Sequence, residues 1–391
     1  MNKKQNTKIR QVPGIKSIII VGVALSALGC SKQNGDTAHV LRNFTQVNLV
    51  ANTSEYDPVT IDPTLLNAFG IAWSPNGIAW VNSVGGHVSE LYSSEGAIVR
   101  TPVNIPSPTD SIGGLPTGIV FSGGTNFNLS NGPSAFLFTG FDGVVSGWNP
   151  ASGNNAKKTG GFAGAAYTGL AIASNNGRNL IYGADFGGNR IDVWDTAFSR
   201  VAMSFKDPTM PANYSPYNIQ AVGEQLFVVY GELTKEGGTV GHISGEGKGF
   251  VSVFKTDGSF IKRFASRGSL NLPWGVTLAP ASFLEAHDVN IKSHSEISVS
   301  KDDAGGNNVN RDPKEPVVLV GNFGDGRINV YSLDSRFLGQ LQSHDHTIVI
   351  EGLWALSFAP STATSINPNR LYFTAGPDNE TDGVFGYLIK Q

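Results

Sequence analysis

Hydrophobic and polar residues alternate along most of the chain in short runs, and glycine, proline, asparagine or aspartate separates the runs. A period of two predicts β-strands, because successive side chains of a strand point to opposite faces. Phe69–Trp73 and Thr117–Phe121 are typical of these runs. Asp142-Gly143, Asp325-Gly326 and Asp382-Gly383 are dipeptides that tight hairpin turns favour. The pattern therefore predicts an all-β protein.

The predicted strands repeat six times along the chain. The first strand of each repeat carries a small or polar residue close to its start, and in the first four repeats these positions recur every 50 residues or so. They are Gly70, Gly118, Gly169, Asn218, Gly275 and Ala355. The two longer spacings contain insertions: a Gly-rich stretch from Glu232 to Gly249, in which we expect a flexible loop over 241–249, and a polar stretch over 281–316.

Six similar units with roughly four strands each describe a six-bladed β-propeller. The last unit stops soon after its third strand, whereas Phe44–Val50 alternates like an isolated strand. We therefore expect this N-terminal strand to complete the last blade and close the ring, in one domain over residues 44–391. Strands do not alternate with long amphipathic helices, which argues against a doubly wound fold or an α/β barrel.

The first 29 residues have the pattern of an export signal. Five basic residues precede an apolar run over 17–29, which is too short to span a bilayer comfortably. Cys30, the only cysteine, follows at once, and this resembles a bacterial lipoprotein signal. The resemblance implies cleavage after Gly29, acylation of Cys30 and a flexible tether over 30–43. It places the protein at a membrane of the bacterial cell envelope, facing the periplasm or the exterior. A buried or reactive free thiol is the alternative.

Four motifs occur in a fixed order in the second half of the chain. They are Asn271–Gly275, Leu319–Gly326, Gly352–Leu356 and Leu371–Gly376. Together they resemble an uncharacterised bacterial family of exported, propeller-like proteins. The resemblance implies the fold and export but no activity, and the stretch over 281–316 departs from the family pattern. The architecture is more distantly similar to lactonase-type and streptogramin-lyase-type propellers, at the level of fold alone.

The charge of the chain argues against a nucleic-acid partner. The chain has 28 basic and 31 acidic residues, and residues 1–29 hold five of the basic ones and no acid. The remaining body is therefore mildly acidic and has no basic footprint for nucleic acid. We expect a monomeric body whose contact with a membrane runs through acylated Cys30.

In a propeller, residues at the start of the first strands meet around one mouth of the central channel. These candidate binding residues are Asn67, Thr117, Thr168, Tyr217, Asn218, Trp274 and Glu351. Aromatic rings beside amides, hydroxyls and one carboxylate suit a neutral polar ligand. The alternative is that these residues cap strands and bond to backbone groups around a water-filled channel.

Oxygen ligands from several blades could also hold a divalent cation on the channel axis. Asp185, Asn218, Asn322 and Glu351 are the candidate ligands for calcium or magnesium. The sequence thus supports two main functions, and a structural scaffold in an envelope assembly is a third alternative. The first is an exported, lipid-anchored module that binds a small molecule or a protein. The alternative is a metal-dependent, lactonase-like hydrolase or lyase acting at the channel mouth.

Overall fold

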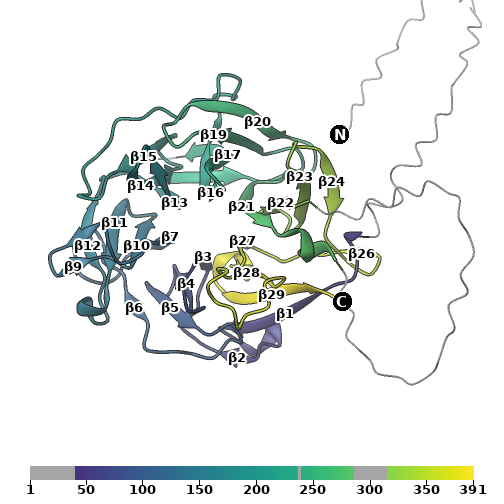
Figure 1. Cartoon of the computed structure of the whole chain (residues 1–391), viewed down its shortest axis with the longest axis horizontal. Helices are drawn as coiled ribbons and strands as arrows, with labels where there is room; N and C mark the ends of the chain where they lie inside the picture. The colour runs from purple at the N-terminus through teal and green to yellow at the C-terminus, as the bar shows by residue number, and fades with distance from the viewer. Residues whose placement is uncertain (1–39, 237–238, 286–314) are drawn as a thin grey trace, which may run out of the picture.

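The computed structural model describes residues 40–236, 239–285 and 315–391. Cys30, the predicted signal, most of the predicted tether and most of the 281–316 stretch lie outside the described residues. The described strands form six blade sheets around a central axis, as Figure 1 shows, and two short two-stranded sheets. This arrangement confirms the predicted all-β, six-bladed propeller.

The strands of each blade pair antiparallel in order outward from the axis, except that the outermost pair of blade 6, β1 and β2, is parallel. Blade 1 contains β3 (Ala68–Trp73), β4 (Ala79–Ser83), β5 (Val88–Tyr92) and β6 (Val103–Asn104). Blade 2 contains β7 (Pro116–Phe121), β10 (Phe136–Gly140), β11 (Val144–Trp148) and β12 (Lys157–Gly161). Blade 3 contains β13 (Tyr167–Asn175), β14 (Arg178–Asp185) and β15 (Arg190–Trp194). Blade 4 contains β16 (Tyr214–Val222), β17 (Gln225–Glu236), β19 (Phe250–Phe254) and β20 (Phe260–Ser266). Blade 5 contains β21 (Pro273–Ala279), β22 (Val317–Asn322), β23 (Ile328–Ser332) and β24 (Phe337–Gln340).

Blade 6 joins the two ends of the described chain. It contains β27 (Leu353–Ser357), β28 (Leu371–Ala375), β29 (Val384–Lys390), β1 (Phe44–Ala51) and β2 (Thr60–Ile61). Strand β1 pairs antiparallel with β29, with Phe44 opposite Lys390. The N-terminal strand therefore supplies the outer part of the last sheet, as predicted, and the C-terminus lies beside it in Figure 1.

Short elements connect the blades or extend their hairpins. The helical turns are η1 (Ser54–Tyr56), η2 (Pro150–Ser152), η3 (Ala281–Leu284) and α2 (Pro377–Glu380). The short strands are β8 (Asn128–Leu129), β9 (Gly132–Pro133), β18 (Thr239–Ile243), β25 (Gln342–Ser343) and β26 (His346–Thr347). No helix within the described ranges is long and apolar enough to cross a membrane.

The Gly-rich insertion of blade 4 is more ordered than the sequence suggested. Strand β17 continues past the end of the blade and pairs with β18, with Leu233 opposite His242. The first residues of the expected flexible loop, 241–243, therefore lie in a β-strand. The alternation in Thr239–Ile243 is too short to stand out beside the surrounding glycines, whose presence favours loops.

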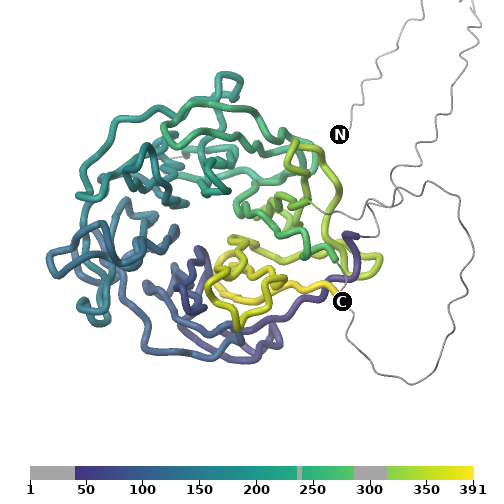
Figure 2. The backbone as a smooth tube through the Cα atoms, in the orientation of Figure 1, coloured from purple at the N-terminus to yellow at the C-terminus, as the bar shows by residue number. Residues whose placement is uncertain are grey.

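The repeated small residues allow neighbouring inner strands to approach closely. The inner strands β3, β7, β13, β16, β21 and β27 each contact the next, and the last contacts the first. A Cβ added at Gly70 would lie 2.2 Å from the Thr117 carbonyl oxygen, and one at Gly169 would lie 1.9 Å from Asn218 Oδ1. The small residues recur in the sequence because the six inner strands pack tightly around one axis. Figure 2 shows the resulting ring as a backbone trace.

Candidate functional site

A cluster of aromatic rings closes the channel near the face where the inner strands begin. Trp354 is fully buried and lies between two phenylalanines. Its ring centroid lies 3.8 Å from that of Phe69 and 4.0 Å from that of Phe323, with both rings nearly parallel to the indole. Trp274 meets Phe69 edge-to-face at 5.2 Å. We call Phe69, Trp274, Phe323 and Trp354 the aromatic plug.

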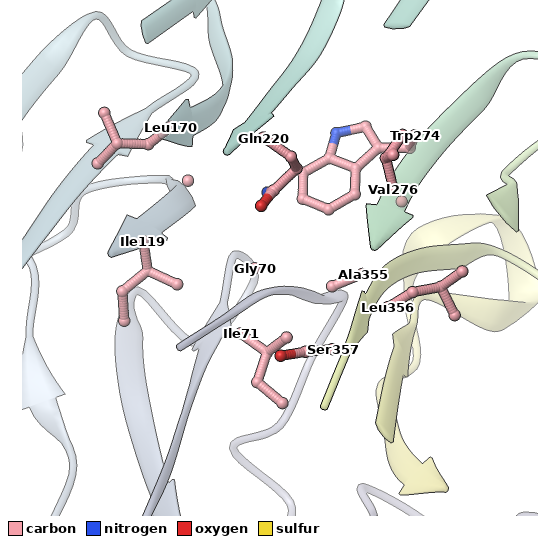
Figure 3. Close-up of a pocket in the computed structure, with 12 residues that line it drawn as sticks. Gly70, Ile71, Ile119, Leu170, Gln220, Trp274, Val276, Ala355, Leu356 and Ser357 are labelled. Atoms are coloured by element: carbon pink, nitrogen blue, oxygen red, sulfur yellow. The ribbon is translucent and has the colours of Figure 1, made fainter. Parts of the chain in front are cut away.

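A small cavity lies on the propeller axis and is lined by the inner strands. It is farther than the plug from the face where these strands begin. Figure 3 shows it with Gln220, Trp274 and side chains of the inner strands around it. The volume of this cavity is about 40 Å³. That is enough for one or two water molecules, whereas sites for small organic ligands usually occupy roughly 300 Å³ or more. The axial cavity is therefore too small for a ligand of that size.

Most of the predicted mouth residues lie at the expected face, but their side chains bond inward. Thr117 Oγ1 donates to the Tyr167 carbonyl oxygen at 2.7 Å, and Thr168 Oγ1 donates to Ala184 O at 3.4 Å. Asn218 Nδ2 donates to the Trp274 carbonyl oxygen at 2.9 Å. These side chains are buried. Thr117 and Asn218 join adjacent blades through backbone carbonyls, whereas the bond of Thr168 lies within blade 3. These bonds to backbone groups match the alternative in which the residues are structural.

Trp274 takes part in the same inward bonding. Its indole nitrogen donates to the Thr168 carbonyl oxygen at 2.9 Å. The ring also lines the axial cavity. Trp274 therefore forms the boundary between plug and cavity, and it is 2% exposed, so a ligand outside the plug would not meet its face.

Asn67 connects the plug to the loop above it. Its Oδ1 accepts a hydrogen bond of 2.8 Å from the Trp354 indole nitrogen, and its Nδ2 donates to Glu380 Oε2 at 2.9 Å. Burial raises the pKa of the half-buried Glu380 carboxyl, and the bond from Asn67 partly opposes that rise. Glu380 is thus held over the plug by a residue of blade 1 although it belongs to blade 6.

The loop that carries Glu380 has an unusual backbone. Asp378, Asn379 and Glu380 have φ values of 51°, 54° and 67°. Three successive non-glycine residues in this left-handed region are costly, at about 1 kcal/mol or more each, and such strain is often found at functional sites. Glu351, one of the predicted mouth residues, accepts a bond from the Asp378 amide at 3.2 Å. Glu351 is exposed, so it lies at the rim and not over the plug.

Tyr217 and His242 form a second polar pair at the mouth. The Tyr217 hydroxyl lies 3.2 Å from His242 Nδ1. Burial raises the pKa of Tyr217 and lowers that of His242, so the phenol keeps its proton and the imidazole is neutral near pH 7. The direction of the bond between them is set by which ring nitrogen of His242 carries the hydrogen. His242 also packs edge-to-face on Phe323 at 5.4 Å.

Each of the four candidate metal ligands bonds to another group of the protein. Asp185 is fully buried, and its Oδ2 lies 2.7 Å from an Arg190 nitrogen. Asn322 Nδ2 donates to Ser269 O at 2.8 Å, while its Oδ1 accepts from Asn329. Asn218 and Glu351 have the partners given above. Within the described part of the chain, no group of three or more His, Cys, Asp or Glu side chains is arranged to hold a metal ion.

Sequence reasoning missed His242, Phe323 and Glu380 as members of the mouth. His242 lies in the blade 4 insertion, and Glu380 lies in α2, between two strands that other blades join by tight turns. Both insertions extend from the face where inner strands begin. The signal that could have found them is therefore the extra length of two hairpins on one face, since such loops carry function.

The fold and this mouth define the class: the protein is a six-bladed β-propeller with a plugged channel. No family model matches the chain. It is 30% identical over 362 residues to the uncharacterized protein L690 of Acanthamoeba polyphaga mimivirus, a match that covers 88% of this chain and 86% of the relative. A second uncharacterized mimivirus protein, R648, is 28% identical over 88% of this chain and 80% of its own length. The chain belongs to the family of the mimivirus protein L690.

This finding corrects the resemblance drawn from the four ordered motifs. The relatives are viral proteins, and the assignment to a bacterial family of exported propellers is wrong. The four motifs lie on or beside the strands β21, β22, β27 and β28. Strand and turn segments of this kind recur among propellers, so they report the fold better than the family.

Several solved propellers are similar to this chain at low identity. Streptogramin B lyase is 12% identical with a TM-score of 0.46, covering 88% of this chain and 97% of that one. A gluconolactonase from Xanthomonas campestris is 13% identical with a TM-score of 0.44, covering 83% and 88%. Similarity at this level says nothing about the activity of this chain.

Proposed function

We propose that this propeller is a binding module and that its ligand carries a positive charge on an apolar body. The observation that carries the proposal is the joint position of Phe323 and Glu380 around Trp354. Phe323 stacks on the indole, and Glu380 is tied to the same indole through Asn67. An aromatic ring beside a carboxylate is the combination that recognises organic cations.

The charges at the mouth support a cationic ligand. Glu351, Asp378 and Glu380 form no ion pair with any Lys or Arg of the described residues. A half-buried carboxylate without a cation is unfavourable, and a bound cation would remove that cost. Phe323, His242 and Glu380 are each partly exposed, so a ligand can reach them without displacing the plug.

The experiment that tests this site compares choline with 3,3-dimethylbutanol, its uncharged analogue of similar shape. Titration is followed by tryptophan fluorescence, because Trp354 lies directly beneath the site. We expect choline to give a saturable change that the neutral analogue does not give, and Glu380→Gln to weaken the choline response at least fivefold. Glu224→Gln, at an exposed glutamate between β16 and β17, is the control and keeps the response. Equal responses to both compounds, or none beyond that of sodium chloride, would reject the proposal.

We further propose that the module is exported and anchored to a membrane through acylated Cys30. The support is the basic and apolar pattern before Cys30 in the sequence. Multiple acyl chains would hold the protein stably, since each buried CH₂ contributes about 0.8 kcal/mol. Expression with labelled palmitate should label the wild type and leave Cys30→Ser unlabelled. Recovery of the wild type without label, in a fraction free of membranes, would contradict this part.

A further inference from the structure

A second buried carboxylate pair lies away from the mouth, where the chain passes from β2 of blade 6 into blade 1. Asp62 follows β2, and Glu90 lies in β5. Glu90 is 1% exposed and Asp62 is 6% exposed. Thr64 Oγ1 stands between them, 2.7 Å from Asp62 Oδ1 and 2.6 Å from Glu90 Oε1.

The number of hydrogens available to this group determines whether one of its carboxyl groups is protonated. A threonine hydroxyl carries one hydrogen, so Thr64 can donate to only one of the two carboxylates. The other short contact is a hydrogen bond only if the second carboxyl is protonated and donates to Thr64 Oγ1. The Tyr92 hydroxyl donates to Asp62 Oδ2 at 2.9 Å, which favours the charged form on Asp62 and leaves the proton on Glu90.

The same three residues occur in blade 4 with a different outcome. Asp207-Pro208-Thr209 repeats Asp62-Pro63-Thr64, and in both places the threonine amide and hydroxyl donate to the aspartate. In blade 4, however, the buried aspartate meets Ser252 at 2.7 Å and the guanidinium of Arg263 at 2.6 Å. Blade 1 has Glu90 in place of Ser252 and no cation at this point, so only a proton can balance the second carboxyl.

We propose that Asp62, Thr64 and Glu90 share one proton, and that this proton fastens the connection between the closing strand and blade 1. Backbone and Ser83 bonds also hold the connection: Asp62 N donates to Ala51 O at 2.9 Å, Leu66 N donates to Ser83 Oγ at 2.8 Å, and Ser83 Oγ donates to Thr64 O at 2.6 Å. The shared proton adds the side-chain link to blade 1 through Glu90. Loss of the proton places two negative charges on one hydroxyl inside the protein and loosens residues 62–66. The ring seam is therefore sensitive to pH.

The groups around Glu90 agree with this assignment. Burial is the largest cause that raises the pKa of Glu90 to about 7, the bond from Thr64 lowers it, and the charge of Asp62 raises it. From blade 6, Phe385 stacks on Tyr92, and Tyr372 stacks on Phe385. The Tyr372 hydroxyl donates to the Ser94 carbonyl oxygen. Neither carboxylate forms an ion pair with a Lys or Arg in the described ranges.

The raised pKa of Glu90 makes the folded protein more stable at low pH than at neutral pH. The ordinary pKa of a glutamate is 4.5, and that of folded Glu90 is about 7, so between these values the unfolded chain has lost a proton that the folded protein keeps. The stabilisation is complete below pH 4.5 and is lost as pH rises to about 7. Over this interval, the equilibrium constant for folding of the wild type should fall by roughly a hundredfold relative to Glu90→Gln.

Glu90→Gln is the informative variant because its amide can donate to Thr64 Oγ1 at every pH. We expect denaturant titrations of this variant to lack the wild-type loss between pH 4.5 and 7, and amide exchange at Leu65 and Leu66 to become less dependent on pH. Glu224→Gln, at an exposed glutamate, serves as the control and should follow the wild type. Parallel pH profiles of wild type and Glu90→Gln would overturn the proposal.

A measurement on the unaltered protein keeps the test independent of the variant's folding. The infrared band of a protonated carboxyl group should be present in the folded wild type at pH 6 and disappear by pH 8. Its absence at pH 6 would overturn the proposal even if Glu90→Gln failed to fold.

Discussion

Trp354 and Asn67 are 287 positions apart in the chain, yet the Trp354 indole nitrogen donates a hydrogen bond of 2.8 Å to Asn67 Oδ1. Trp354 lies in β27 of the last blade, and Asn67 immediately precedes β3 of the first. This bond therefore crosses the seam at which the ring closes. Because Asn67 also donates to Glu380, the same amide joins the seam to the mouth.

Trp354→Phe should destabilise the fold by about 3 kcal/mol, because it removes ring volume from a packed cluster and leaves Asn67 Oδ1 buried without its donor. Denaturant unfolding measures the change. Trp80→Phe is the matched control: Trp80 is 3% exposed and stacks on Phe136 at 4.1 Å, and its indole nitrogen bonds to no described residue. We expect the control to cost clearly less. Equal losses would show that the bond across the seam contributes nothing.

Gly169→Ala should disturb the contact between blades 3 and 4. The added methyl group would lie 1.9 Å from Asn218 Oδ1, so Asn218 would have to move away from the Trp274 carbonyl oxygen. Overpacking of this kind costs about 1–3 kcal/mol. At Gly160 no atom lies within 4 Å of the added Cβ, and Gly160→Ala should change the free energy of unfolding by less than about 0.5 kcal/mol. A similar result at both positions would contradict the packing explanation for the repeat.

The repeat could be predicted from the sequence because each unit carries its own small residue in the inner strand. A small residue such as Gly70 allows an inner strand to approach its neighbour closely, and in the first four units the next such position follows after about 50 residues. The closing strand was readable for a similar reason. Phe44–Ala51 alternates without a partner nearby in sequence, while the last unit lacks an outer strand.

The contacts at the channel mouth join residues that are far apart in the sequence, so no local sequence pattern predicts them. Asn67 was predicted at the correct face, but its partners Trp354 and Glu380 come from the far end of the chain. The left-handed backbone that carries Glu380 is not favoured by its own residues and is held by surrounding contacts. His242 follows several glycines, which conceal the hairpin that brings it to Tyr217.

Calcium and magnesium should leave the thermal stability of this propeller unchanged. Asp185, Asn218 and Asn322 already bond to Arg190, to backbone groups or to Asn329, and Glu351 is an exposed rim residue. A cation that binds the folded protein alone would raise the melting temperature with concentration. Millimolar additions should shift it by less than about 1 °C, in the wild type and in Glu351→Ala alike. A saturable rise that Glu351→Ala abolishes would contradict this prediction and support the metal-dependent alternative.

The ion pair between Asp207 and Arg263 should give blade 4 its own sensitivity to acid. Bonds from Arg263, Ser252 and Thr209 outweigh the effect of burial and lower the pKa of Asp207 from 3.8 to about 2. A carboxylate with a lowered pKa stabilises the fold above pH 4, and this contribution of about 2 kcal/mol is lost as pH falls to 2. Asp207→Asn should therefore be less stable than the wild type at pH 7, and the difference should shrink as the pH is lowered through this range.

Urea unfolding of the two proteins at a series of pH values measures that difference directly. Asp345→Asn is the control, since its ion pair with Arg42 lies at the surface, where the Asp345 side chain is 81% exposed. Exposed pairs of this kind contribute little, so the control should track the wild type at every pH. A difference between wild type and Asp207→Asn that stays constant down to pH 2 would mean that the asparagine disturbs packing, and that the charge on Asp207 is not what holds Arg263 in place.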